Sequence, residues 1–186
     1  MAFASRQYST CRGDHENFNG GFDVKNKPGK LFCVNVQNGL RFFQYLGDDS
    51  TQLGSNLIAI FNGTFRTLQD ASPAAIKASG VAFYAHVLLK LGLKLGVWKP
   101  HSEAEVISYG DVWFRDSPDY GNPAIKETGT WWLWRANQKR VTVHGRSDDL
   151  VNSHVGVVVT PSDIVNRMES GAYAFFYPTY PHQVGP

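Results

Sequence analysis

The pattern of apolar positions predicts a helix near the start of the chain. Val36, Leu40 and Phe43 recur at intervals of four and three positions, which is typical of one buried helical face. Gly47 follows at the position where a helix C-cap is expected. We therefore predict a helix over residues 33–46, preceded by a loop-rich lead-in over residues 1–29.

A second helix is predicted over residues 73–91. Ser72 is a preferred N-cap residue, and Pro73 suits the first helical position. Gly80 weakens the helix, because glycine has a low helix propensity. His86 lies inside this segment, where a single histidine is usually a core or edge residue. The apolar run over residues 57–61 is too short for its periodicity to separate helix from strand.

The second half of the chain has the texture of β-structure. A turn at Gly110 and Asp111 leads into a strand over residues 112–115, and residues 130–134 and 140–144 are predicted to form a hairpin. Further strands are expected from His154 and over residues 172–177. Helices followed by antiparallel strands predict an α+β domain, with N-terminal helices packed on a C-terminal antiparallel sheet.

Three tryptophans, Trp131, Trp132 and Trp134, lie close together on one of these strands. Such a group can form a platform for a sugar or peptide, or it can cap the core. Large aromatic side chains bury much apolar area, so we favour the core-capping interpretation.

Composition limits the classes of function. The 186 residues are enough for one domain with a full core, and 42% of them are apolar. The net charge is +2 and the basic residues are scattered, so nucleic acid is not an expected partner. No apolar run approaches the length of a membrane span, and no signal-peptide pattern is visible. We expect synthesis in the cytoplasm and no membrane partner.

The two cysteines, Cys11 and Cys33, allow one disulfide but do not form a CxxC pair. Cys11 and His15 are four residues apart, yet Gly13 between them disfavours a helix, and two ligands do not make a zinc site. No metal or cofactor is expected.

Cys33 is the candidate nucleophile. A thiol at the first turn of a helix faces unpaired N–H groups and the positive end of the helix dipole, which favour the thiolate. The alternative is that Cys33, next to Phe32 and Val34, is a small buried apolar residue. His154, at the start of an apolar run, is the candidate base.

Three short patches resemble the NlpC-type peptidases and CHAP amidases, papain-like enzymes that cut peptidoglycan. The patches are Phe32-Cys33, Gly110-Asp111-Val112-Trp113-Phe114 and Ser153-His154-Val155-Gly156-Val157-Val158, and their order agrees with that family. The resemblance implies a single papain-like domain over residues 1–186. The long separation of Cys33 and His154 then requires insertions near residues 48–100 and 116–145.

The resemblance also implies a mechanism. His154 would take the proton of Cys33, whose thiolate would attack a peptide carbonyl to form an acyl-enzyme that water clears. A polar residue would orient the imidazole. Asn166 and Asp163 are the nearest candidates for that role, with His144 more distant.

The implied function is hydrolysis of peptide bonds in peptidoglycan stem peptides. Phage lysins and the amidase effectors of type VI secretion are the functional groups of that family that this chain resembles. They imply delivery to the periplasm or cell wall, and an immunity or inhibitor protein as a further partner. Two alternatives remain open. One is a cysteine-dependent acyltransferase or deamidase of the same fold, and the other is a non-enzymatic viral or phage structural protein.

Overall fold

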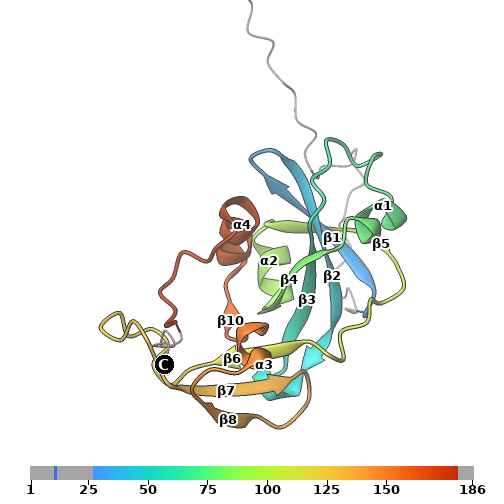
Figure 1. Cartoon of the computed structure of the whole chain (residues 1–186). Helices are drawn as coiled ribbons and strands as arrows, with labels where there is room; N and C mark the ends of the chain where they lie inside the picture. The colour runs from blue at the N-terminus through green and yellow to red at the C-terminus, as the bar shows by residue number, and fades with distance from the viewer. Residues whose placement is uncertain (1–10, 12–26, 180–186) are drawn as a thin grey trace, which may run out of the picture.

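Two β-sheets organise the chain (Figure 1). The computed structural model describes residue 11 and residues 27–179. The larger sheet has the order β10-β4-β3-β2-β1-β5. Its strands are β1 (Lys30–Val36), β2 (Gly39–Asp49), β3 (Ser55–Phe61), β4 (Val81–Val87), β5 (Trp98–Glu103) and β10 (Val158–Val159). The smaller sheet has the order β8-β7-β6-β9. Its strands are β6 (Trp113–Asp116), β7 (Thr130–Arg135), β8 (Val141–His144) and β9 (His154–Val155).

The helices are short and few. They are a 3-10 turn η1 (Ser50–Gln52), α1 (Pro73–Ala78), α2 (Leu89–Lys94), α3 (Asp148–Val151) and α4 (Pro161–Ser170). The predicted mixture of helix and sheet is confirmed, with sheet predominant. Within the described residues, however, no α-helix precedes Pro73, so sheet rather than helix forms the N-terminal part of the fold.

The helix predicted over residues 33–46 is wrong. These residues form β1 and β2, an antiparallel pair joined by a two-residue turn at Gln37 and Asn38, with Cys33 opposite Phe42. The physical reason is that this part of the sheet is covered on both faces. Phe32 and Val34 belong to the core on one face, and Leu31 and Cys33 belong to the core on the other. A strand buried on both faces has a continuous apolar run, which an apolar helical face can imitate.

The helix predicted over residues 73–91 begins as expected and ends early. The Ser72 hydroxyl accepts a hydrogen bond from the Ala75 N–H at 3.2 Å, and Pro73 is the first helical residue. Gly80 then adopts a φ of 73°, which turns the chain out of the helix. Residues 81–87 form β4, where the β-branched and aromatic side chains pair with β3.

The polar stretch after Thr160 forms helix α4, which the hydrophobic pattern did not indicate. Thr160 and Asp163 form a reciprocal capping box, Pro161 is the first helical residue, and Gly171 ends the helix in the left-handed region at φ 82°. The strand expected over residues 172–177 does not form, and these residues follow α4 irregularly.

The hairpin predicted in the smaller sheet is confirmed, but the sheet is not wholly antiparallel, because β9 pairs with β6 in parallel. β7 and β8 form the hairpin, with Trp132 opposite Thr142, and β6 pairs with β7. Trp131 and Trp134 are fully buried, as the core interpretation of the tryptophans requires.

The segment from His154 to Val159 joins the two sheets. β9 pairs with β6 in the smaller sheet, and β10 pairs with β4 in the larger one. Gly156 lies between them, and its N–H donates to the Arg115 carbonyl at 2.7 Å. A Cβ at Gly156 would overlap the indole of Trp134, so only glycine fits there.

Replacing Gly156 by alanine should therefore separate the sheets at their junction. We expect Gly156→Ala to lower the free energy of unfolding by about 2 kcal/mol or more, because the Trp134 indole has no room to move in a packed core. Gly129→Ala is the matched control, since a Cβ there meets no atom within 4 Å. Urea unfolding of both variants measures the difference, and equal midpoints would contradict this account of the junction.

Candidate functional site

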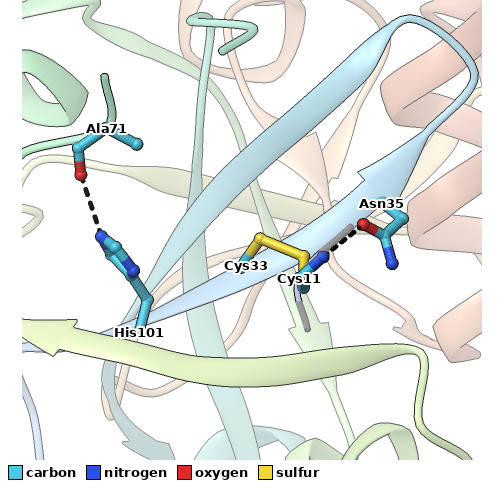
Figure 2. The surroundings of a disulfide bond; sticks show 5 residues. All are labelled: Cys11, Cys33, Asn35, Ala71 and His101. Carbon is cyan, nitrogen blue, oxygen red and sulfur yellow. Dashed lines mark hydrogen bonds between the residues drawn. A yellow bond between two sulfur atoms is a disulfide. The ribbon is translucent and has the colours of Figure 1, made fainter. Parts of the chain in front are cut away.

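Cys33 is not a free thiol. It forms a disulfide with Cys11, with the two Cα atoms 6.1 Å apart, and both residues are buried (Figure 2). The Cys11 N–H donates to the Asn35 side chain at 2.9 Å, which fastens this residue to β1. The disulfide left open by the sequence is thus present. The expectation of a thiolate is wrong for this state, because a disulfide sulfur carries no titratable proton.

The helix start that was expected to activate Cys33 is also not formed. Cys33 lies in the middle of β1, between Phe42 on β2 and Lys99 on β5. His15, the partner considered for Cys11 as a metal ligand, lies outside the described residues.

The structure does not bring the three predicted catalytic residues together. His154 begins β9, in the other sheet from Cys33, and Asn166 is exposed on α4. Within the described residues, no hydrogen bond or ring contact joins any two of the three.

The other candidates for orienting the imidazole have structural roles. Asp163 caps α4 through Thr160. His144 lies on β8, with its Nδ1 3.5 Å from the Thr130 hydroxyl.

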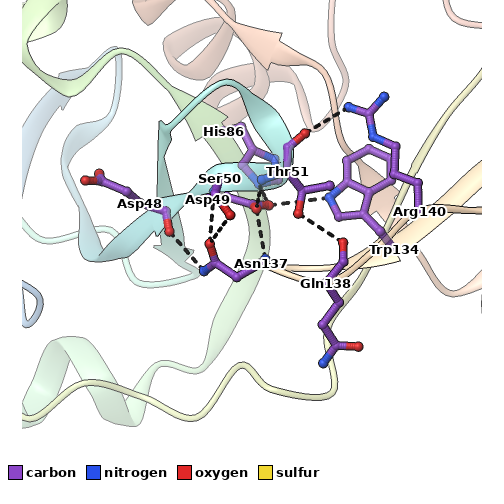
Figure 3. Close-up of polar contacts among 9 residues, drawn as sticks. All are labelled: Asp48, Asp49, Ser50, Thr51, His86, Trp134, Asn137, Gln138 and Arg140. Atoms are coloured by element: carbon purple, nitrogen blue, oxygen red, sulfur yellow. Dashed lines mark hydrogen bonds and ion pairs between the residues drawn. The ribbon is translucent and has the colours of Figure 1, made fainter.

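His86, which was expected to lie in the core or at its edge, is fully buried beside an equally buried carboxylate. Its Nε2 lies 2.9 Å from Asp49 Oδ2 (Figure 3). The same carboxylate accepts from the backbone N–H groups of Thr51 and Asn137, each at 2.9 Å. Burial alone raises the pKa of Asp49, but these hydrogen bonds outweigh it and hold the pKa well below its usual range. Because neither side chain reaches solvent, this pair holds the fold and is not a ligand site.

The candidate site surrounds His154 and is called the basic–aromatic cluster. Its members come from both sheets, from the loop between β6 and β7, from α4 and from the C-terminal segment, residues 172–179. They are Tyr84, Arg115, Tyr120, His154, Arg167, Tyr173, Phe175 and Tyr177.

A row of aromatic rings in this cluster has one arginine at each end. On one side, the Arg167 guanidinium lies 3.9 Å from the ring centroid of Phe83 and 4.4 Å from that of Tyr173. Tyr173 in turn stacks on Phe175, with centroids 4.8 Å apart. This arrangement fixes Arg167 between two ring faces, where the cation–π attraction is favourable.

The other side of the row runs through Tyr120. The Tyr120 ring lies 5.7 Å from Phe175 and 5.7 Å from Tyr177, and Tyr177 lies 5.8 Å from the Arg115 guanidinium. The Tyr177 hydroxyl also donates to the Arg115 carbonyl at 2.9 Å. Arg115 itself donates to the carbonyl and hydroxyl of Ser153.

The charges of both arginines act on His154. Its ring is 5.2 Å from the Tyr84 ring, edge to face. Burial, together with the charges of Arg167 and Arg115, lowers the pKa of His154 to about 4. The imidazole is therefore neutral at pH 7 and does not add a third positive charge.

Arg167 has an unused donor. Its Nη1 is buried and has no acceptor in good hydrogen-bond geometry among the described residues, although the guanidinium lies close enough to the Tyr173 hydroxyl to oppose the rise in the pKa of Tyr173 that burial causes. The ion pairs within residues 27–179 do not include Arg167. A buried N–H without an acceptor is costly, and guanidinium groups suit planar or tetrahedral oxyanions. The arrangement can therefore bind an anion.

Several side chains with shifted pKa values lie in or next to the basic–aromatic cluster. Burial raises the pKa values of Tyr84, Asp116, Tyr120 and Tyr173, and lowers that of His154. Clusters of shifted groups are more frequent at functional sites than elsewhere. Sequence reasoning found His154 but missed both arginines, because no local spacing links residue 115 to residue 167.

No protein-family model, curated protein or solved structure matches this chain. The structure itself adds two findings. Among the described residues, no three histidine, cysteine or acidic side chains gather as metal ligands. None of the described helices is long and apolar enough to cross a membrane.

The disulfide leads to a chemical prediction. Neither cysteine should react with iodoacetamide in the unreduced protein, because both sulfurs are bonded and buried. Replacing both by serine should lower the free energy of unfolding by about 3 kcal/mol, since the bond closes a loop of 22 residues. Mass spectrometry and urea unfolding measure these effects. Rapid alkylation of Cys33 without reductant would contradict the structure and restore the nucleophile.

The burial of His154 predicts a pH-dependent stability. The unfolded chain protonates this histidine near pH 6.5, whereas the folded protein does so only near pH 4. Acid therefore favours the unfolded state between these values, and the penalty reaches about 2 to 3 kcal/mol at pH 4. His154→Gln should lack this loss. Unfolding free energies of both proteins at pH 7, 6, 5 and 4 test it, and parallel profiles would contradict it.

Proposed function

We propose that this chain is a binding protein that holds an anionic group, phosphate or carboxylate, at the basic–aromatic cluster. The observation that carries the proposal is the buried Nη1 of Arg167, which has no acceptor in good hydrogen-bond geometry among the described residues although the charge of a second arginine acts on the same histidine. An oxyanion supplies the missing acceptor.

The cluster is rigid before any ligand arrives. Arg167 is held between Phe83 and Tyr173, and Arg115 is held by Ser153. A site whose donors are already oriented loses little entropy when the ligand binds. Arginine also offers a fork of N–H groups that matches phosphate and carboxylate oxygens better than lysine does.

His154 adds selectivity to such a site. As a neutral imidazole on which the charges of two arginines act, it can donate one hydrogen bond and accept one. It therefore suits a ligand group that combines a charged oxygen with a neutral polar neighbour, and it leaves the two arginines as the source of charge.

The disulfide bears on the cell compartment. Disulfides persist in oxidising compartments such as the periplasm and the extracellular space. The Cys11–Cys33 bond therefore supports a protein that acts there, in agreement with the expected delivery to the periplasm or cell wall.

A papain-like cysteine amidase, or an acyltransferase or deamidase of that fold, stays a prediction from the resemblance. Such chemistry requires the disulfide to be reduced and Cys33 to meet His154, and the geometry of the described residues supports neither step. Among the earlier alternatives, a non-enzymatic protein agrees better with an anion-binding role.

Arg167→Gln should weaken the binding of inorganic phosphate or acetate at pH 7 by about tenfold or more, because it removes a charge-assisted pair. Arg167→Lys keeps the charge without the planar fork, so its affinity should lie between those of the wild type and Arg167→Gln. Exposed Arg66→Gln is the control for net charge. Isothermal titration calorimetry measures affinity, and circular dichroism confirms folding.

Two results would refute the proposal. One is the absence of saturable phosphate or acetate binding by the wild-type protein at millimolar concentrations. The other is equal binding by the Arg167→Gln and Arg66→Gln variants, which would show that the affinity comes from overall charge.

A further inference from the structure

Trp132 is the tryptophan of strand β7 that the core does not fully cover. Trp131 and Trp134 are fully buried, whereas Trp132 is partly exposed beside the core cluster that contains Phe114 and Trp134. An indole that a sheet holds in place and that still reaches solvent can stack on a ligand with little loss of side-chain freedom. The surroundings of Trp132 therefore indicate which ligand it suits.

The strand register places a polar residue on each side of Trp132. Asp116 on β6 and Thr142 on β8 are its direct cross-strand partners. Directly opposite residues of antiparallel strands lie on the same face of the sheet, with Cβ atoms about 5 Å apart. Thr142 is exposed and Asp116 is partly exposed. One row across three strands thus presents a carboxylate, an indole and a hydroxyl.

The next row on the same face adds a second hydroxyl and an imidazole. Thr130 lies two residues before Trp132, about 7 Å along the strand, and its direct partner on β8 is His144. The Thr130 hydroxyl lies 3.5 Å from His144 Nδ1, and His144 is exposed. Hydroxyl and imidazole groups can both donate and accept hydrogen bonds. The five residues of the two rows are called the Trp132 face.

Charges of opposite sign flank the indole. Arg140 directly precedes β8 and Asp116 ends β6, the two strands that lie beside β7. The Arg140 guanidinium lies 5.9 Å from the centroid of the Trp132 ring. A cationic ligand on Trp132 would be repelled by Arg140, and an anionic ligand would be repelled by Asp116. The Trp132 face therefore favours a neutral ligand.

A pyranose sugar has the neutral chemistry that this surface requires. One side of its ring is a flat set of C–H groups, which the negative face of an indole attracts. Its hydroxyls lie around the rim, where they can donate to a carboxylate and exchange hydrogen bonds with threonine. An apolar peptide side chain would instead cover these polar groups without giving them partners, which is unfavourable.

We infer that the Trp132 face binds a neutral pyranose sugar, stacked on Trp132 with its hydroxyls on Asp116 and Thr142. The row of Thr130 and His144 gives a second sugar unit of the same saccharide chain polar partners. This inference goes beyond the proposed function and does not depend on it, because the Trp132 face shares no residue with the basic–aromatic cluster.

NMR titration of the full chain at pH 7 tests the inference, with glucose, galactose, N-acetylglucosamine and cellobiose as the probes. We expect at least one of them to shift the indole N–H signal of Trp132 saturably, with a millimolar dissociation constant. The signal that Trp132→Phe removes identifies this indole among the five tryptophans. Trp132→Ala should weaken sugar binding by about tenfold, the scale of one aromatic contact.

Trp113→Ala is the matched control. Trp113 is also partly exposed, but it lies on the neighbouring strand β6 and packs on the opposite face of the sheet, against the cluster of Trp131 and Leu133. Its removal should leave sugar affinity unchanged. Thr142→Val tests the same site without touching the core, and it should weaken binding by about threefold, the scale of one neutral hydrogen bond. Circular dichroism confirms that each variant is folded.

Four results would overturn the inference. The first is that none of the four sugars binds saturably up to about 100 mM. The second is equal sugar affinity in the Trp113→Ala and Trp132→Ala variants, or in Thr142→Val and the wild type. The third is that inorganic phosphate, and no sugar, shifts the Trp132 signal. The fourth is a loss of sugar affinity in Arg167→Gln, which would place the sugar at the basic–aromatic cluster. Phosphate binding that depends on Arg167 would leave the anion site standing in each of the first three cases.

Discussion

The buried Asp49 carboxylate is the contact on which the two-sheet arrangement depends. Asp49 ends β2, and its acceptor oxygens lie near donors from β4, from β7 and from the turn after β7: His86 Nε2 at 2.9 Å, the Trp134 indole N–H at 3.4 Å and the Asn137 N–H at 2.9 Å (Figure 3). A buried carboxylate is tolerated only when hydrogen bonds replace its lost hydration. The sheets must therefore keep the one relative position in which these donors meet it.

The positions of the residues in the candidate site depend on this contact. Phe114 on β6 packs against His86, with centroids 4.5 Å apart, and against Trp134 at 6.1 Å. The next residue, Arg115, and the paired His154 are thereby placed at the junction of the sheets. Helix α4 carries Arg167, whose charge acts on the same histidine. The anion site is thus a consequence of how two sheets and one helix are joined, and each element supplies one part of it.

Cys33 shows how a local pattern can suggest the wrong chemistry. Its apolar neighbours imitate a helical face because both sides of β1 are covered, and a thiol at a helix start would indeed be activated. In the strand, the same residue has no dipole to face, and Cys11 is close enough to bond with it. The functional interest consequently moves from Cys33 to the surroundings of His154, the other half of the predicted dyad.

The sequence by itself determined the features that depend on near neighbours along the chain. The β7–β8 hairpin, the buried Trp131 and Trp134, and the helix start at Ser72 all follow from residues a few positions apart. Packing between distant segments settled which face a strand buries, which residue pairs with Cys33, and which arginine charges act on His154. The physical reason is that these contacts join distant segments, and their energies depend on chain closure and packing, which no local spacing encodes.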